Sequence, residues 1–246
     1  MQIIPAFVTQ NKCYQAGAPL TPRGIMLHSV GTPQPSARAL VRYMDQYQPG
    51  GQSVCVHAVA QADGTVYQTL PWEMRGWHCG GSANSTHIGV EMTEPSAGMT
   101  RSEAAEQIAG TYRTVVELFA ELCKQYELDP AQDGVIIGHA EGHRRGVASN
   151  HADPELLWRT YDMGYTMDGF RADVAEAMKN GAREEALDMP RYDSVAEMPQ
   201  WARADAQRLI DRGALQGNTD GKLDVSEDML RTMIVCQRMV DEQKET

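Results

Sequence analysis

Residues 100–126 read TRSEAAEQIAGTYRTVVELFAELCKQY, and this segment constrains the arrangement of the whole chain. Thr100 and Glu103 have the spacing of a capping box, in which two side chains bond to free backbone N–H groups at a helix start. Apolar residues then recur with a helical period as far as Tyr126. A helix of this length must bury its apolar face, and we expect it to pack on a β-sheet.

Strand-like segments occur on both sides of this helix. Residues 86–94 (THIGVEMTE) precede it, and residues 133–139 (DGVIIGH) follow it. Residues 24–28 (GIMLH) form another short apolar run, and residues 53–71 predict a hairpin around an Asp-Gly turn. Residues 36–47 have helical spacing after a serine that can cap the helix. This alternation predicts an α/β fold with a central mixed β-sheet flanked by helices.

The composition changes near residue 180, which predicts a large domain over residues 1–180. Residues 181–193 are polar and lack a sustained apolar period, so we interpret them as a linker. Residues 194–246 contain two helical stretches, 199–213 and 226–240, joined by a turn-rich segment. These residues predict a small all-helical module that is too short to hold a large core alone.

Composition also argues against several classes of protein. The formal net charge of -11 argues against nucleic-acid binding, and no run approaches the ~20 apolar residues that would insert into a membrane. The N-terminal segment lacks a basic region and has Pro5 in its only apolar run, so we expect no signal peptide and synthesis in the cytoplasm. The five widely spaced cysteines are typical of a protein folded in a reducing compartment.

Two histidines stand at the ends of apolar strands. His28 ends one strand and His139 ends another, so the two side chains can converge if the strands are neighbours. Catalytic zinc sites use three protein ligands and leave the fourth position to water. Asp153, on the segment that returns from His139, is the natural third ligand. The sequence predicts a single metal site, and a hydrogen-bonded core histidine is the alternative for His28.

Residues 138–158, GHAEGHRRGVASNHADPELLW, contain no helical zinc motif. Gly138, Gly142 and Gly146 make a regular helix unfavourable, so we expect a loop here. We therefore expect His143 to be a surface residue and not a metal ligand. A short helix is expected only from Pro154 onward.

Four motifs in this chain, taken in order, resemble the zinc-dependent N-acetylmuramoyl-L-alanine amidases of the phage-lysozyme and peptidoglycan-recognition-protein type. The motifs are MLHSVG (26–31), RGWHCGG (75–81), IGVEMTEP (88–95) and the segment 138–158 quoted above. SNHADPELLW especially resembles phage and prophage endolysins that attack the walls of Gram-positive (Firmicute) hosts. The resemblance implies one bound Zn²⁺ and cleavage of peptidoglycan between the lactyl group of N-acetylmuramic acid and L-alanine of the stem peptide.

The resemblance also implies roles for individual residues. His28, His139 and Asp153 match the family's zinc ligands, and Glu91 matches the general base. His151 matches a position that is commonly lysine and that stabilises the developing oxyanion. Val56 stands where some members have a catalytic tyrosine, which puts more of the proton transfer on Glu91.

Other candidate residues have structural alternatives. Trp77 and His78, in a glycine-flanked loop, are expected to line a glycan groove or merely to pack. Glu91 could face solvent from an edge strand, and Glu94 ranks lower because it lies at the strand's exit. His57 is expected to be structural.

Two other functions remain open for the large domain. The first is a module that recognises peptidoglycan without cutting it, and the second is a zinc peptidase with the same ligands. The complete ligand set, together with Glu91, favours an enzyme over a binding module.

Residues 194–246 resemble the short C-terminal segments of such endolysins and, more distantly, S-layer homology repeats. This resemblance implies attachment to the cell wall or formation of a homodimer, and packing on the catalytic domain is the alternative. A protein made in the cytoplasm without a signal peptide would reach the wall only after lysis or through a pore made by another protein.

Overall fold

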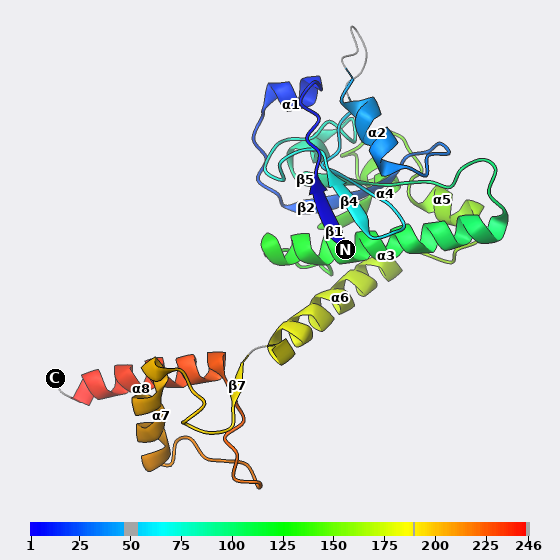
Figure 1. The fold of residues 1–246 in the computed structure, drawn as a ribbon. Coiled ribbons are helices and arrows are strands. Elements are labelled where there is room, and N and C mark those ends of the chain that lie inside the picture. Colours follow the sequence, from blue (N-terminus) through cyan, green and yellow to red (C-terminus); the bar gives the residue numbers. More distant parts are fainter. Residues whose placement is uncertain (47–53, 189, 245–246) are drawn as a thin grey trace. The chain divides into compact units, whose positions relative to one another are not determined.

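The computed structural model describes the backbone of residues 1–46, 54–188 and 190–244 (Figure 1). It divides into two compact units, residues 1–179 and 180–246. The first unit contains a six-stranded sheet in the order β1-β4-β3-β5-β2-β6. Only β3 and β4 pair antiparallel, so the sheet is mixed, as predicted. The strands are β1 (Gln2–Pro5), β2 (Gly24–Ser29), β3 (Ala58–Ala60), β4 (Thr65–Gln68), β5 (His87–Met92) and β6 (Ile136–Gly138).

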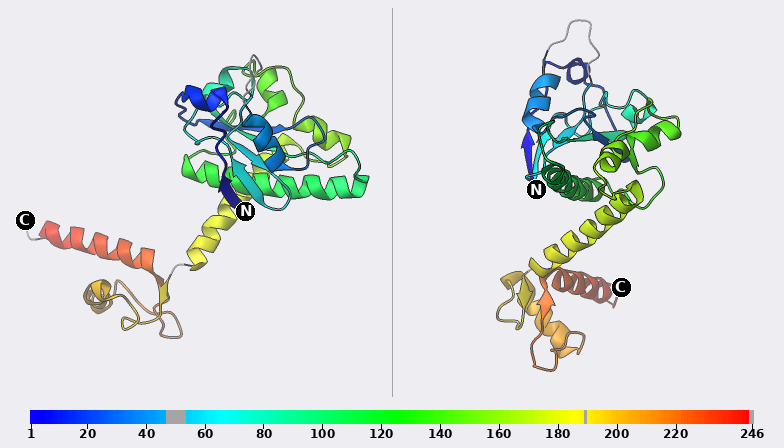
Figure 2. Two further views of the ribbon diagram at one scale, coloured as in Figure 1. Left: turned by 45° about the horizontal axis from the view of Figure 1, so that its top comes forward. Right: turned by 90° about the vertical axis from the view of Figure 1, so that its right-hand side faces the viewer.

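The long helix α3 (Arg101–Gln125) covers one face of this sheet (Figure 2). Thr100 and Glu103 form the predicted capping box at its start. Its buried side chains, among them Val115 and Leu118, share a core with Leu27 of β2. Burial of each such side chain contributes about 1.5–3 kcal/mol to stability, so the long amphipathic helix and the sheet stabilise one another.

Two shorter helices cover the opposite face. The helices α1 (Lys12–Ala16) and α2 (Ala37–Met44) cluster with Val59 of β3. Ser36 caps α2 as predicted, while Tyr47, at the expected end of that helix, lies outside the described residues. The hairpin of β3 and β4 is also confirmed, although its first expected residue, Ser53, lies outside the described part.

Strand alternation directs the functional residues to the face opposite α3. Successive side chains of a strand point to opposite faces. Ile25 and Leu27 belong to the core under α3, so Met26 and His28 point the other way. His28 pairs in register with Glu91 of β5, which therefore points to the same face.

The prediction of a loop after Gly138 is wrong for the first six residues. His139–Arg144 form the helix α4, which follows β6 without a gap. A Cβ on Gly142 would lie 2.9 Å from Met26 Cε, so this glycine allows α4 to approach β2 closely. The close packing that glycine permits thus offsets its poor helix propensity. Gly146, with a φ of 72°, follows after the helix has ended.

Two further helices follow α4 in the chain, and the second of them extends past residue 179, where the first unit ends. Glu155–Thr160 form α5, in agreement with the helix predicted after Pro154. Met167–Asp188 form α6, whose Phe170 and Val174 are buried in the core under α3. The expected linker over residues 181–193 is therefore helical as far as Asp188, while residue 189 lies outside the described part.

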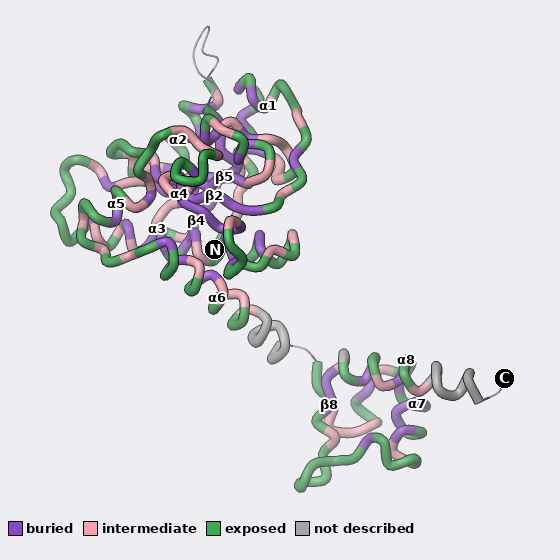
Figure 3. The backbone as a smooth tube through the Cα atoms, turned by 180° about the vertical axis from the view of Figure 1, so that it is seen from behind, coloured by how far each residue is buried: buried purple, intermediate pink, exposed green. Residues whose placement is uncertain are grey.

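The second unit contains the two predicted helices, α7 (Gln200–Asp211) and α8 (Glu227–Lys244). A short antiparallel pair, β7 (Arg191–Tyr192) and β8 (Val225–Ser226), adds a two-stranded sheet that the sequence did not predict. Buried residues occur on both α7 and α8 and form a small core of their own (Figure 3). None of the described helices in either unit is long and apolar enough to cross a membrane.

Candidate metal centre

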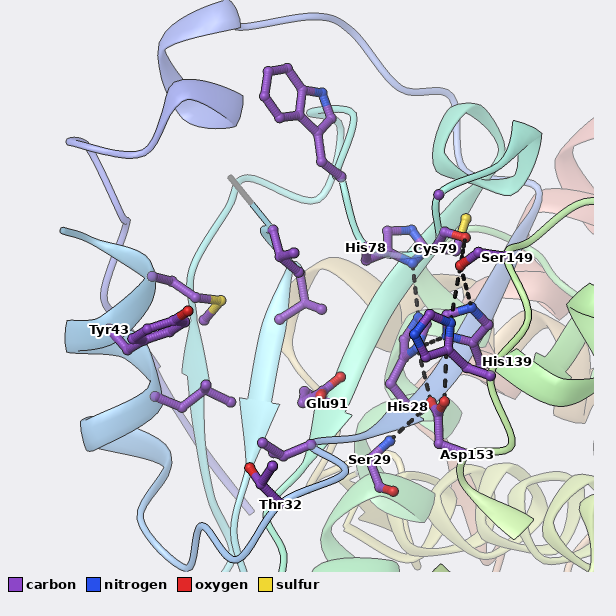
Figure 4. A pocket seen from close by; sticks show the side chains of 18 of the residues that line it. His28, Ser29, Thr32, Tyr43, His78, Cys79, Glu91, His139, Ser149 and Asp153 are labelled. Carbon is purple, nitrogen blue, oxygen red and sulfur yellow. Dashed lines mark hydrogen bonds and ion pairs between the residues drawn. The ribbon is translucent and has the colours of Figure 1, made fainter. Parts of the chain in front are cut away.

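The structure brings together the three residues that the sequence proposed as metal ligands (Figure 4). His28 lies near the end of β2, and His139 is the first residue of α4, directly after the neighbouring strand β6. Asp153 approaches both from the loop before α5. The two Nδ1 atoms of the histidines lie 3.0 Å apart, and Asp153 carboxylate oxygens lie 3.2 Å from His28 Nδ1 and 3.5 Å from His139 Nδ1.

These distances fit the coordination shell of a zinc ion. A tetrahedral zinc with bonds of about 2.0–2.1 Å to nitrogen and oxygen keeps its ligand atoms about 3.3–3.4 Å apart. The three observed distances lie on either side of this value. Two imidazoles and one carboxylate are also a donor set that catalytic zinc uses.

The charge states of the ligands suit a cation. Burial, together with the charge of His28, lowers the pKa of His139 to about 4, so its ring is neutral near pH 7. Burial alone would raise the pKa of Asp153, but the hydrogen bond and charge of His28 lower it overall. Burial lowers the pKa of His28, but the Asp153 hydrogen bond and the Glu91 charge outweigh it and raise the pKa. A metal ion at this site therefore competes with a proton on His28.

His78 determines which ring nitrogen of His28 faces the metal site. His78 Nε2 lies 3.2 Å from the carbonyl oxygen of His87, which can only accept, so His78 Nε2–H donates. Burial holds the pKa of His78 well below its usual range, so the ring is neutral and its Nδ1 accepts. His28 Nε2–H then donates to His78 Nδ1 over 2.9 Å. The lone pair of His28 Nδ1 is thereby left for a metal ion.

Ser149 has the same effect on His139. The Ser149 hydroxyl donates to the carbonyl oxygen of Cys79 over 3.0 Å, so its oxygen accepts from the histidines around it. His139 Nε2 lies 3.3 Å from this oxygen, which leaves His139 Nδ1 directed at Asp153 and His28. His151 Nδ1 lies 3.1 Å from the same oxygen. Ser149 was not among the residues predicted from the sequence, where its place in the ASNHAD segment is its only signal.

The loop that carries His78 is held in place by neighbouring residues. Asn84 Oδ1 accepts hydrogen bonds from the backbone N–H groups of His78 and Cys79. On β5, a Cβ at Gly89 would lie 2.4 Å from His78 Cγ, so only glycine leaves room for this ring. The glycine in the IGVEM motif therefore has a packing role beside the metal site.

Glu91 lies beside the metal cluster in the same pocket. Burial raises the pKa of its carboxyl group to about 7, although the charge of His28 lowers it in part. Among the described residues, none forms a hydrogen bond with this carboxylate. A carboxyl group that is poised near neutral pH can both accept and donate a proton.

The pocket has a volume of about 910 Å³ and is lined by all the residues that were proposed as metal ligands, catalytic groups or glycan contacts. Trp77 is half-buried on its wall, and His151 is exposed at its edge. His78 also borders the pocket, but it is 7% exposed and both ring nitrogens bond within the protein, so it supports His28 and offers no free polar atom to a ligand. Tyr43 of α2 lies across the pocket from the metal cluster (Figure 4).

The remaining candidates have structural roles or lie outside the pocket. Glu94 Oε1 accepts a hydrogen bond from the Gly31 N–H and does not line the pocket. His57 is fully buried and bonds to the Met74 carbonyl oxygen, which agrees with its expected structural role. His143 is exposed on α4, away from the metal cluster.

The fold and the candidate metal cluster belong to a known class of enzyme. The sequence profile of the N-acetylmuramoyl-L-alanine amidase family matches residues 18–156, which is more than half of the chain. The chain therefore belongs to the N-acetylmuramoyl-L-alanine amidase family and is a peptidoglycan-hydrolysing enzyme of that kind. No curated protein matches this chain in sequence.

Solved structures of related enzymes share the fold of the first unit. The hydrolase AmiA of Staphylococcus aureus, solved with its ligand, has a TM-score of 0.58 at 21% identity, over 72% of this chain and 83% of its own. The catalytic domain of XlyA has a TM-score of 0.52 at 22% identity, over 71% of this chain and 99% of its own. A mutant endolysin from Bacillus subtilis has a TM-score of 0.51 at 21% identity, with the same two coverages.

We predict that His78→Phe weakens zinc binding about 10- to 100-fold, because the His28 Nε2–H loses its acceptor and its orientation. His78→Gln should restore much of the affinity, since an amide oxygen can accept from His28 while its NH₂ group donates to the His87 carbonyl oxygen. The measurement is the zinc dissociation constant by chelator competition. The exposed His143→Gln is the control, and an unchanged zinc affinity in a folded His78→Phe protein contradicts this role.

Proposed function

We propose that the protein is a zinc-dependent endolysin that releases the stem peptide from peptidoglycan. His28, His139 and Asp153 would hold one Zn²⁺, which supplies the Lewis acidity that activates water and polarises the substrate carbonyl. The observation that carries this proposal is the convergence of these three residues with Glu91 in one pocket of an amidase-family chain.

Glu91 is the proposed general base. Its carboxylate accepts a proton from the attacking water and then gives that proton to the nitrogen of the leaving L-alanine. The amide C–N bond breaks, the lactyl group of N-acetylmuramic acid becomes a carboxylic acid, and the stem peptide gains a free amine. A pKa of about 7 lets one group perform both transfers, because neither protonation state is strongly favoured near neutral pH.

His151 is the proposed partner of the oxygen that becomes negative during attack. Its ring centroid lies 4.5 Å from that of His139, so it borders the place where the substrate carbonyl must sit. The Ser149 oxygen accepts a hydrogen bond from His151 Nδ1–H, so Nε2 is the nitrogen that can face the substrate. Nε2 acts as a donor when the ring is an imidazolium, in which both nitrogens carry a proton. A donor placed before the reaction begins stabilises the developing charge without reorganisation. We further propose that Trp77 contacts the glycan strand.

The similar structures include a staphylococcal hydrolase and an endolysin from Bacillus subtilis. They support a Gram-positive wall as the substrate and action after release of the protein from the cell. A module that binds peptidoglycan without cutting it is less well supported, because all three candidate metal ligands and the candidate general base Glu91 are present in the pocket. A zinc peptidase is the alternative enzyme, and the products of digestion separate the two.

For the second unit we propose attachment to carbohydrate of the cell wall. Trp201 on α7 is 42% exposed, and the Arg231 guanidinium lies 4.7 Å from the centre of its ring. Arg231 also bonds to Glu227, which accepts from the Tyr192 hydroxyl. An exposed aromatic ring beside a network of polar side chains is typical of a binding surface. Homodimer formation through α7 and α8 is the alternative that the same surface allows.

We predict that zinc removal abolishes activity. A chelator should stop the enzyme from clearing a turbid suspension of Gram-positive walls. Added zinc should restore the clearing, because the metal again activates the attacking water as a Lewis acid. Digested walls should show new L-alanine N-termini and no new reducing ends. New N-termini at another stem residue would instead identify a peptidase, and bound but undigested walls would identify a recognition module.

We predict that Glu91→Gln retains zinc but lowers kcat/KM by about 10²- to 10⁴-fold, because the water loses its proton acceptor. In the wild type, the rate should rise with pH through the Glu91 pKa, since a base acts only when it is deprotonated, and this rise should be absent in the variant. Steady-state kinetics and metal content provide the measurements. Glu94→Gln is the matched control, and undiminished turnover in Glu91→Gln would remove Glu91 from the mechanism.

We predict that Trp201→Ala reduces co-sedimentation of the full-length protein with purified walls by about tenfold or more, because an aromatic anchor is lost. Val235→Ala is the control, because Val235 is an apolar residue of α8 that is even more exposed than Trp201, at 56% against 42%. Sedimentation velocity of the free protein tests dimer formation separately. Full wall binding by Trp201→Ala would rule out attachment through this ring.

A further inference from the structure

Two buried cysteines, Cys13 and Cys55, lie behind the lining of the metal-site pocket and have no role in the mechanism above. Cys13 is on α1 and Cys55 precedes β3, and both belong to the core cluster on the face of the sheet opposite α3. Their chain neighbours Lys12, Val54 and Val56 line the pocket. A bond between the two thiols would therefore join two parts of the pocket's lining.

One asparagine side chain holds the backbone at both cysteines. Asn11 Oδ1 accepts a hydrogen bond from the Cys13 N–H over 2.9 Å, and Asn11 Nδ2–H donates to the Val54 carbonyl oxygen over 3.2 Å. Asn11 is 4% exposed, so these bonds are shielded from water. The residue that caps α1 therefore also fixes the chain next to Cys55.

Residues 75–77 contact both cysteines from a second direction. Cys13 Sγ lies 3.2 Å from the Arg75 carbonyl oxygen, and Cys55 pairs with Trp77 through two backbone hydrogen bonds of 3.0 and 3.1 Å. Between these supports the two thiols form a hydrogen bond with one another. A disulfide requires the sulfur atoms to move from this contact to a bond of about 2.05 Å, while the flanking backbone is already held.

The two thiols differ in acidity, which gives each one a separate part in such a reaction. The hydrogen bond with the Cys55 side chain lowers the pKa of Cys13, so Cys13 forms the thiolate first. The same hydrogen bond raises the pKa of Cys55, and burial and the charge of Cys13 raise it further. Once Cys13 Sγ is bonded to another sulfur it carries no charge, so both effects of Cys13 disappear. Cys55 then becomes the second nucleophile.

We propose that Cys13 and Cys55 form a disulfide when the protein meets a medium that contains an oxidising small-molecule disulfide. The Cys13 thiolate attacks one sulfur of this oxidant and displaces a small thiolate, which leaves a mixed disulfide at Cys13. The Cys55 thiolate then attacks Cys13 Sγ and displaces the second small thiolate. The two protein thiols lose two protons and two electrons in all, and the oxidant is reduced to two thiols.

The short helix α1 provides a way for the oxidant to reach Cys13. It has five residues, of which Cys13 alone is buried. A segment with few buried contacts opens locally at a lower free-energy cost than the rest of the core. The Cys13 side chain is 1% exposed when α1 is in place, so the reaction proceeds through this local opening.

The biological setting of the disulfide rests on the proposed function, in which the protein acts after release from the cell. Thiols stay reduced in the cytoplasm, whereas a disulfide persists in the oxidising medium outside. The bond would close the loop between residues 13 and 55 and so restrict the unfolded chain. Release would therefore stabilise the first unit at the place where it works.

The first test uses the full-length, zinc-loaded protein, incubated either with oxidised glutathione or with a reducing agent. Trypsin digestion distinguishes the possible pairings, because each of the five cysteines lies on a different tryptic peptide. Mass spectrometry without reduction should show residues 13–23 linked to residues 43–75 in the oxidised sample. Reduction should release the two peptides.

The second test measures stability by calorimetry of the full-length protein. Oxidation should raise the melting temperature of the first unit by about 5–15 °C, because the disulfide restricts the unfolded chain. This difference between oxidised and reduced samples of one protein should disappear in Cys13→Ala and in Cys55→Ala. Cys123→Ala is the matched control and should keep the difference, since Cys123 is also buried but lies in the core under α3. Comparison within each variant removes any effect of the substitution itself.

Three outcomes overturn the proposal. Oxidised wild-type protein could lack the link between residues 13–23 and 43–75, with either cysteine free or paired with Cys79. The linked protein could melt no higher than the reduced protein, or the rise could persist in Cys13→Ala or Cys55→Ala. Wall cleavage is assayed separately, and its absence counts against the amidase reaction alone, so the two failures are distinguishable.

Discussion

The parallel pairing of β2 with β5 on one side and β6 on the other is the constraint on which the site depends. The register sets His28 beside Glu91 and Leu27 beside Gly138, so that His139 begins its helix next to His28. Parallel strands place their carboxyl ends at one edge, which is where side chains from distant parts of a chain can meet. The loop that returns to α5 adds Asp153. A shift of one residue in either pairing would turn a ligand to the opposite face of the sheet.

The metal site depends as much on buried hydrogen bonds as on the ligands. Two imidazole nitrogens 3.0 Å apart cannot both carry a proton without repulsion, and burial of a charged ring is unfavourable. The protein resolves this by giving each ring one internal acceptor: His78 for His28, and Ser149 for His139. The remaining lone pairs then face one point near Asp153. The outer residues therefore select the tautomers that the inner residues need.

The sequence predicted the parts of this structure that depend on local pattern. The capping box at Thr100, the hairpin at its Asp-Gly turn and the apolar strand before His28 each carry their signal within a few residues. The helix α4 was missed because its glycine is tolerated only through contact with Met26, which is more than a hundred residues away in the chain. The helical continuation of α6 as far as Asp188 and the two-residue strands of the second unit likewise lack a clear local pattern.

The candidate ligands could be proposed because histidines at strand ends and a family resemblance pointed to the same three positions. The role of His78 could not be predicted from the sequence. It depends on the fold, which places the His87 carbonyl oxygen at one nitrogen of the His78 ring and the His28 ring at the other. Gly89 completes this arrangement because any side chain there would occupy the space of the His78 ring. Positions 78 and 89 therefore form an epistatic pair: a larger residue at 89 becomes admissible only in a background where 78 has already shrunk. Directed evolution of this enzyme toward another metal should accordingly randomise the two codons together.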